Sequence, residues 1–319
     1  MQFQPLEPSE LPLVRRAMLP LRDPVARVLR WAWSHTSHAT STWCDSRRWR
    51  AVWNLVRWFG AVPRQQPELV RCRFGPRIVM ELDLSRLTDV LALCYGPGEN
   101  EVAHACRRLC PRDGVVADIG GNIGTTALAF AALVPAGHVH VFEPSPGMLR
   151  CLRRNIELSR AHNITVHDYG VGDVARRGRL QVAIAGNPGS AFISDTADDD
   201  ECQAASGDPI EVRRLDEALR DIERLDFVKI DVEGLELRVL RGAEALLRRH
   251  RPSVLFEVNE GALRRGGTSG REVCEYLMSL GYRLHYLQAG RFRSYDVATM
   301  PTRKLHNVIG SFHDLTSRP

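Results

Sequence analysis

The fold is decided by one stretch, Val115-Val-Ala-Asp-Ile-Gly-Gly-Asn-Ile-Gly124, which leads into an apolar run over residues 125–134. A short apolar strand that ends near an acid, turns through glycines and opens a helix is typical of a nucleotide-cofactor loop. Gly120 and Gly121 have no Cβ, so the backbone at both can adopt a positive φ and lie against a ligand. We expect Gly124, one helical turn later, to let the helix pack closely on its strand. The stretch therefore predicts a cofactor loop.

The spacing of the glycines distinguishes between cofactors. A dinucleotide loop has the pattern Gly-x-Gly-x-x-Gly, but here Asn122 stands two positions after Gly120. An NAD-dependent oxidoreductase is therefore the weaker alternative. Asp118, ahead of the first glycine, suits a ligand with a cationic end, and the ammonium and sulfonium of S-adenosylmethionine are such groups. The stretch favours S-adenosylmethionine, bound by Asp118, Gly120, Gly121, Asn122 and Gly124.

A second apolar strand, residues 139–142, ends in Glu143, 25 positions after Asp118. A carboxylate that closes the neighbouring strand can accept hydrogen bonds from both ribose hydroxyls with its two oxygens. Ser145 is expected to cap the helix that follows. We therefore add Glu143 to the predicted cofactor-binding residues.

Strands and helices alternate along the core, which predicts an α/β fold with a doubly wound parallel sheet and helices on both faces. With two late strands at residues 282–287 and 306–309, we expect seven strands, mostly parallel, the last antiparallel. Four acids each end a predicted strand: Asp118, Glu143, Asp231 and Glu257. Because open α/β sheets bind ligands at the carboxyl ends of their strands, these acids should line one crevice.

Several motifs together resemble the FkbM-type S-adenosylmethionine-dependent methyltransferases over about residues 79–311. They are Asp118-Ile-Gly-Gly-Asn-Ile-Gly124, Phe142-Glu-Pro144, Asn155, Val171-Gly-Asp173, Lys229-Ile-Asp-Val-Glu-Gly-Leu-Glu236 and the strand that ends at Glu257. The resemblance implies a Rossmann-like class I methyltransferase fold and methyl-transfer activity. It also implies that Asp173 or its backbone binds the adenine amine; a plain Gly-Asp turn is the alternative. Gly121 departs from the family, which more often has alanine there, a change that leaves the turn sterically accessible.

The predicted reaction is methyl transfer to a hydroxyl of a sugar or secondary metabolite, as in glycan or natural-product tailoring. A hydroxyl acceptor must lose its proton as it attacks, and a nearby carboxylate can take that proton. Asp231 is the first candidate base and Glu257 the second. A helix N-terminal cap is the alternative role for Asp231. For Lys229, beside these candidate bases, the alternative to a role in the reaction is purely structural: a strand residue whose ammonium is paired by a nearby acid.

Residues 1–62 form a predicted helical extension that contains all six tryptophans and many arginines. We expect it to pack on the catalytic core. The alternative is peripheral contact with a membrane or with a lipid-linked substrate, since Trp and Arg suit a headgroup boundary. The same segment suggests an alternative function for the whole chain, that of a non-catalytic binding subunit in a biosynthetic or lipid-linked glycan assembly. A lead-in hairpin and helix over residues 63–113 would precede the methyltransferase domain, residues 114–319.

Other segments carry weaker expectations. The resemblance to the methyltransferases implies that Tyr95 and Glu99 touch ligand. Strands are expected at residues 179–184 and 209–213 around a long polar loop, in which residues 187–192 are a candidate lid on the acceptor side. An apolar stripe at helical spacing predicts one helix over residues 236–249.

Composition narrows the partners, metal sites and cellular locations that the sequence allows. The net charge is +5, and only Lys229 and Lys304 are lysines, but no aromatic-basic motif accompanies the arginines, so no nucleic-acid partner is expected. No Cys-x-x-Cys pair is present, so no metal site is expected. Glu7 and Glu10 interrupt any signal peptide, no apolar run reaches the roughly 20 residues of a membrane span, and unpaired cysteines suit a cytoplasmic location. The acceptor, any need for a divalent metal and the oligomeric state stay open.

Overall fold

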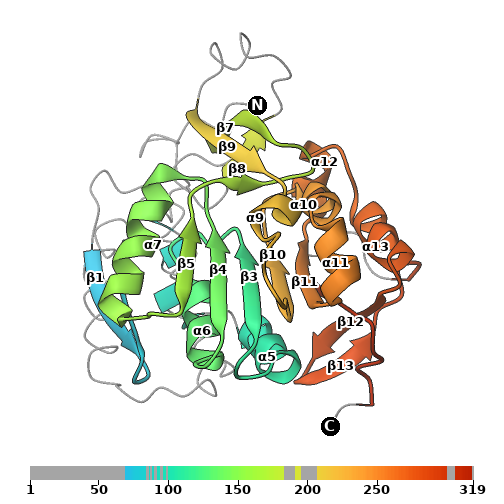
Figure 1. Cartoon of the computed structure of the whole chain (residues 1–319), viewed down its shortest axis with the longest axis horizontal. Helices are drawn as coiled ribbons and strands as arrows, with labels where there is room; N and C mark the ends of the chain where they lie inside the picture. Colours follow the sequence, from blue (N-terminus) through green and yellow to red (C-terminus); the bar gives the residue numbers. More distant parts are fainter. Residues whose placement is uncertain are drawn as a thin grey trace, which may run out of the picture.

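A central sheet organises the computed structural model, which describes residues 69–83, 86, 88–89, 92–93, 96–97, 100–182, 191–194, 207–299 and 306–317. The predicted extension over residues 1–62, Tyr95 and Glu99 lie outside these residues. The sheet has eight strands, in the spatial order β13 (Arg291–Ser294), β12 (Arg283–Gln288), β14 (His306–Ser311), β11 (Ser253–Val258), β10 (Phe227–Ile230), β3 (Val115–Ile119), β4 (His138–Phe142) and β5 (Ile164–His167) (Figure 1).

The sheet is mostly parallel, as predicted. The five strands from β11 to β5 pair in parallel, and β14 pairs antiparallel with both β11 and β12. The expected number of seven strands was wrong, because β13 adds an eighth by pairing antiparallel with β12. The two are joined by a tight turn in which Ala289 and Gly290 have φ of 49° and 74°. Only Phe292 of β13 is buried, so its alternation was too short to mark a strand.

Helices cover both faces of the sheet, which confirms the predicted layers. On one face lie α5 (Asn100–Leu109), α6 (Thr125–Leu133) and α7 (Pro146–Ser159), around a core in which Phe130 of α6 meets Phe227 of β10 edge to face at 5.7 Å. The Ser145 hydroxyl accepts a hydrogen bond from the Met148 N–H and caps α7, as expected.

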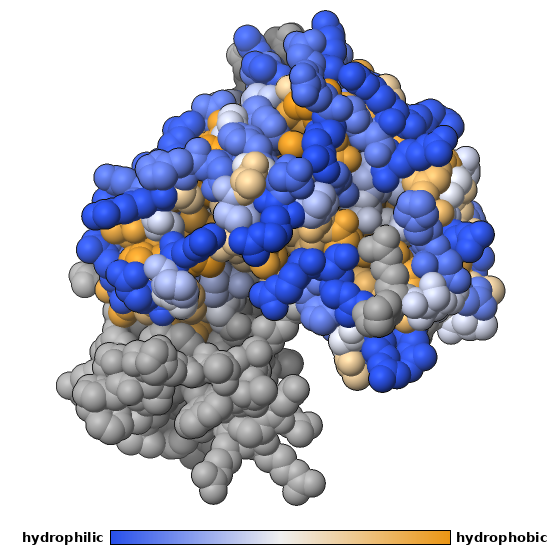
Figure 2. All heavy atoms as spheres, turned by 60° about the horizontal axis from the view of Figure 1, so that its bottom comes forward, coloured by the Kyte–Doolittle hydropathy of each residue, from blue (hydrophilic) through white to orange (hydrophobic). Residues whose placement is uncertain are grey.

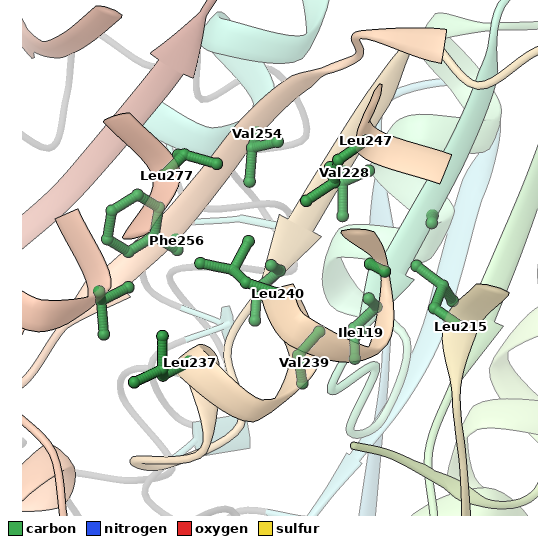
Figure 3. Packing of buried hydrophobic residues seen from close by; sticks show 14 of the residues in the cluster. Ile119, Leu215, Val228, Leu237, Val239, Leu240, Leu247, Val254, Phe256 and Leu277 are labelled. Atoms are coloured by element: carbon green, nitrogen blue, oxygen red, sulfur yellow. The ribbon is translucent and has the colours of Figure 1, made fainter. Parts of the chain in front are cut away.

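The other face is covered by α9 (Leu215–Ala218), α10 (Glu236–Gly242), α11 (Glu244–His250) and α13 (Gly270–Ser279), and the short α12 (Glu260–Arg265) follows β11. Figure 3 shows Leu237 and Leu240 of α10 in one cluster with Val254 and Phe256 of β11. This packing fixes α10, and with it the loop that precedes α10, against the middle of the sheet.

The single helix expected over residues 236–249 is in fact two helices that meet at Ala243. A Cβ on Gly242 would lie 1.9 Å from the Gly172 carbonyl oxygen, so the first helix ends where the chain passes closest to a neighbouring loop. The carboxylate of Asp216 accepts hydrogen bonds from the N–H groups of Ala245 and Leu246, which starts the second helix. The cap comes from α9, so the periodicity of residues 236–249 alone could not reveal it.

A two-stranded hairpin, β1 (Leu69–Phe74) and β2 (Ile78–Asp83), stands beside α7. It turns at Gly75, whose φ is 62°. Buried Asn155 of α7 accepts a hydrogen bond from the Glu81 N–H at 2.7 Å, and it donates one to the Ile123 carbonyl at 2.9 Å. One side chain therefore joins the hairpin to the predicted cofactor loop.

A smaller sheet interrupts the alternation between β5 and β10. It consists of β6 (Gly170–Val171), β9 (Asp208–Arg213), β7 (Arg176–Val182) and β8 (Ala191–Ser194), in that spatial order. The strands β7, β8 and β9 lie at the top of Figure 1, beyond the carboxyl ends of β3 and β4. The strand β8 was not expected, and it takes up the last two residues of the candidate lid; residues 187–190 lie outside the described ranges.

One face of the described surface is mainly polar (Figure 2). Figure 2 shows hydrophilic side chains over much of one face, with apolar atoms in separate patches. Within the described ranges, no helix combines the length and apolar character needed to cross a membrane.

Candidate functional site

The strand register brings the predicted acids to one edge of the sheet. Ile119 pairs with Ile230 and Phe142, and Ile230 pairs with Phe256. The residues that follow these therefore lie in one row at the carboxyl ends of the strands: Gly120, Asp231, Glu143 and Glu257. Asp118 precedes this row by two residues on β3, which places it on the same side of the pleat.

Asp118 is fully buried and bonded to protein groups. Its Oδ2 accepts a hydrogen bond from the Thr126 hydroxyl at 2.6 Å, and its Oδ1 lies 3.4 Å from the Lys229 ammonium. Burial raises the pKa of Asp118, while Lys229 and Thr126 oppose that shift. Asp118 thus holds the strand, the following helix and Lys229 together, and its contact with a ligand stays a prediction.

Lys229 is the organising cation of this edge. Its side chain is 5% exposed, and its Nζ lies 3.3 Å from Asp231 Oδ2 and donates to the Gly120 carbonyl at 3.0 Å. The pairing with a nearby acid, left as an alternative by the sequence, is observed with two acids. A lone lysine in an apolar strand of an arginine-rich chain was the signal available.

The glycines of the turn serve packing more than the sequence suggested. Gly120 has φ of 86°, and a Cβ there would lie 1.9 Å from the Asp231 carbonyl oxygen. Positive φ occurs next at Asn122 (48°) and not at Gly121, where a Cβ would instead lie 2.2 Å from Val141 Cγ2. The expectation of positive φ at Gly121 was therefore wrong. Its hydrogen makes room for β4.

Gly124 also differs from its predicted role. Its φ is 93°, and a Cβ would lie 2.7 Å from Leu152 Cδ1. The close approach is thus to α7 and not to the preceding strand. Because Gly124 is the N-cap of α6, its left-handed conformation sets the direction in which α6 leaves the turn.

Glu143 connects two loops at the edge of the sheet. Its Oε2 accepts a hydrogen bond from the Asn122 N–H and its Oε1 accepts one from the Ser145 N–H, both at 2.8 Å. Burial raises the pKa of Glu143 to about 7, although the two N–H donors oppose this. Each carboxylate oxygen can accept a further hydrogen bond, so the predicted pairing with two ribose hydroxyls is compatible with this geometry.

Several buried polar atoms have no hydrogen-bond partner in the described part of the chain, Asp118 Oδ1 and Glu236 Oε2 among them, and two further acceptors belong to predicted cofactor-binding residues. They are Asn122 Oδ1, on the turn, and Asp173 Oδ1, after β6. The Asp173 carbonyl is already used, since it accepts a hydrogen bond from Arg214 at 2.5 Å. A buried acceptor without a donor is costly, so both side chains fit a ligand that supplies N–H or O–H groups.

The loop between β10 and α10 carries two carboxylates, Asp231 and Glu233. The Asp231 side chain is 38% exposed. Glu233 has φ of 55°, and burial, followed by the charge of Asp231, raises the pKa of Glu233 to about 7. Asp231 does not cap α10, which begins without a side-chain cap. The proposed alternative role for Asp231 is therefore not observed.

Glu236 was quoted in a motif but not assigned a role, and the structure gives it one. It is 2% exposed, and its Oε1 accepts hydrogen bonds from the N–H groups of Val232 and Gly234. Burial raises the pKa of Glu236 to about 7. Glu236 therefore fixes the backbone that presents Asp231 and Glu233.

Glu257, the second candidate base, lies on β11, where it pairs in register with Asn307 of β14. It is partly buried and belongs to the strand, which continues to Val258. Among the described residues, no group of three or more His, Cys, Asp or Glu side chains could hold a metal ion.

Comparison with known proteins agrees with this architecture. The family model for the methyltransferase FkbM domain matches residues 118–284. Methyltransferase 1 of Beauveria bassiana is 29% identical over 155 residues, which are 42% of this chain and 60% of that protein. The 2-O-methyltransferase NoeI of Sinorhizobium fredii is 27% identical over 180 residues, 52% of this chain and 72% of that protein.

Among solved structures, the methyltransferase FkbM from Methylobacillus flagellatus KT is similar, with a TM-score of 0.40 and 20% identity. The match covers 62% of this chain and 44% of that one. The chain thus spans less than two thirds of the length of the Beauveria and Methylobacillus proteins.

Proposed function

The chain belongs to the FkbM family of S-adenosylmethionine-dependent methyltransferases, and from this premise we propose that it methylates a hydroxyl oxygen of a sugar or a secondary metabolite. One observation carries the proposal: a half-exposed carboxylate, Asp231, stands directly beside the turn at Gly120. An acceptor hydroxyl at this position would meet a base next to the donor.

The residues present fit the cofactor. Glu143 can accept hydrogen bonds from the ribose, and the buried acceptors Asn122 Oδ1 and Asp173 Oδ1 lack donors that a nucleoside and an amino-acid group carry. The negative charge at this edge of the sheet suits the cationic ends of the ligand. When bound, S-adenosylmethionine supplies a methyl group already activated by the sulfonium.

Asp231 is the proposed base for the acceptor. Its Oδ2 is held 3.3 Å from Lys229, and because the side chain is half-exposed, the carboxylate can still accept a proton from an incoming hydroxyl. Alignment of the hydroxyl with the methyl group supplies much of the rate, since the two reactants are held together in one site. Glu257 of β11 is the second candidate.

Two further observations support an oxygen acceptor. The relative NoeI is named as a 2-O-methyltransferase. The segment after β10 is Asp231-Val-Glu-Gly234, and it has no resemblance to the Asn-Pro-Pro-Tyr type of segment associated with methylation of amino groups. Both favour a hydroxyl over an amide or base nitrogen.

The test is methyl transfer from labelled S-adenosylmethionine to a panel of methyl glycosides and polyhydroxylated natural products, with primary and aromatic amines as a parallel panel. We expect label in O-methyl ethers, identified by mass spectrometry, and stoichiometric S-adenosylhomocysteine. Transfer to the amines alone would refute the proposal. The Asp231→Ala variant, checked for folding by circular dichroism, should bind the cofactor and lose turnover.

A further inference from the structure

The site contains one buried cation among several carboxylates, and the methyl-transfer reaction gives this charge a role. Lys229 Nζ lies 3.4 Å from Asp118 Oδ1, 3.3 Å from Asp231 Oδ2 and 3.0 Å from the Gly120 carbonyl oxygen. Each of the three acceptors belongs to the turn or to the strand ends that form the proposed donor site. The lysine therefore acts on the backbone of the turn and on the charge of both acids.

We propose that Lys229 is the electrostatic counter-charge of the donor site, and that it sets how strongly the site prefers the sulfonium donor over the neutral thioether product. The inference rests on the donor site proposed above. Within the trio of Lys229, Asp118 and Asp231, one of two negative charges is cancelled. S-adenosylmethionine and S-adenosylhomocysteine differ by the methyl group and one positive charge, so the uncancelled charge favours the donor.

The balance matters for turnover as well as for binding. Methyl transfer removes the positive charge from sulfur, so a strongly negative site would stabilise the reactant more than the transition state and slow the reaction. A site with no net charge would let the product compete with the donor. One buried lysine between two acids gives an intermediate field.

The magnitude is large enough to measure. At an effective dielectric constant of about 20, one unit charge changes the affinity of a site for a nearby cation by roughly tenfold or more. Screening by salt and water reduces this, and we expect at least about a fivefold change in the ratio of the two dissociation constants.

The experiment measures, by isothermal titration calorimetry, the dissociation constants of S-adenosylmethionine and S-adenosylhomocysteine for the purified chain and four variants. Asp231→Asn should lower the preference for the donor at least about fivefold. Lys229→Met should raise it by a similar factor when the pH is high enough to keep the buried Asp118 ionised without the lysine. Lys229→Arg should keep the wild-type ratio. The pair Asp118→Asn with Lys229→Met should return the ratio toward wild type, because the net charge of the trio is restored.

The outcomes separate this role from simpler ones. If Lys229→Met and Asp231→Asn weaken both ligands equally, the lysine is only structural and the inference is overturned, while the donor site stands. If wild type binds both ligands but neither variant alters either dissociation constant, the donor site itself is misplaced. Should Lys229→Met fail to fold, Asp231→Asn still decides, because an unchanged ratio in this variant contradicts the inference.

Discussion

Replacing Gly120 by alanine should distort the turn that follows β3 and lower the stability of the whole protein. The added Cβ would lie 1.9 Å from the Asp231 carbonyl oxygen, in a backbone with φ of 86°. The left-handed conformation costs a non-glycine residue about 1 to 2 kcal/mol, and the overpacking adds about 1 to 3 kcal/mol. The carbonyl cannot move away freely, because the Asp231 N–H is bonded to Ile119 at 3.0 Å. We therefore expect Gly120→Ala to lower the free energy of unfolding by about 2 to 5 kcal/mol.

Gly267→Ala is the matched control. Gly267 also has a positive φ, 75°, but a Cβ there would meet nothing within 4 Å. Gly267→Ala should lower the free energy of unfolding only by the cost of the left-handed backbone conformation, about 1 to 2 kcal/mol. Urea unfolding gives both free energies, and calorimetry with S-adenosylmethionine gives the binding constants. Gly120→Ala should lose binding and Gly267→Ala should keep it.

The reasoning fails if the two variants lose equal stability, since the close approach to Asp231 would then cost nothing. It also fails if Gly120→Ala is destabilised as expected yet binds the cofactor with unchanged affinity. In that case the turn would be a packing element and not part of the donor site.

Three further predictions follow from single side chains. Asp231→Ala should keep its fold and lose turnover by about 100-fold or more, as expected for a general base, whereas Glu257→Gln should lose less; full turnover in Asp231→Ala would contradict the assignment. Because the pKa of Glu236 is raised to about 7, above its unfolded value, its contribution to stability is present below about pH 4.5 and is lost as the pH rises through 7. Measured by urea unfolding, the free energy of unfolding should fall less between pH 5 and pH 8 in Glu236→Gln than in wild type, by about 1 to 3 kcal/mol. An equal fall in both proteins would show that Glu236 does not titrate in this range. Asn155→Ala leaves the N–H of Glu81 and the carbonyl of Ile123 without partners, so unfolding measurements should show a loss of about 2 to 4 kcal/mol; a loss below 1 kcal/mol would contradict this.

The sequence predicted the central strands because each is a short apolar run that ends in an acid. Val115–Ile119 and Phe227–Ile230 are buried on both faces, so their residues are apolar at nearly every position. The same pattern placed Asp118, Glu143, Asp231 and Glu257 within one residue of the strand ends, and parallel pairing brought these ends together. The edge strand β13 has only one buried side chain, and nothing in Arg291–Ser294 separated it from a loop.

The features that the sequence could not supply depend on contacts between distant segments. The break at Ala243 depends on a cap from Asp216. A glycine is needed at position 121 because Val141 of another strand occupies the place of a Cβ. The position of Lys229 between Asp118 and Asp231 depends on the register of β10 against β3. Local patterns carry no information about such pairings.

The small sheet has a consequence for how this protein can diverge. Its first and last strands, β6 and β9, are neighbours, with Gly170 opposite Val212 and Val171 opposite Arg213. The chain therefore leaves the central fold after β6 and returns to it after β9 at adjacent points. The segment between Asp173 and β9 can be lengthened, shortened or exchanged during evolution while Asp173 and the row of strand ends stay in place.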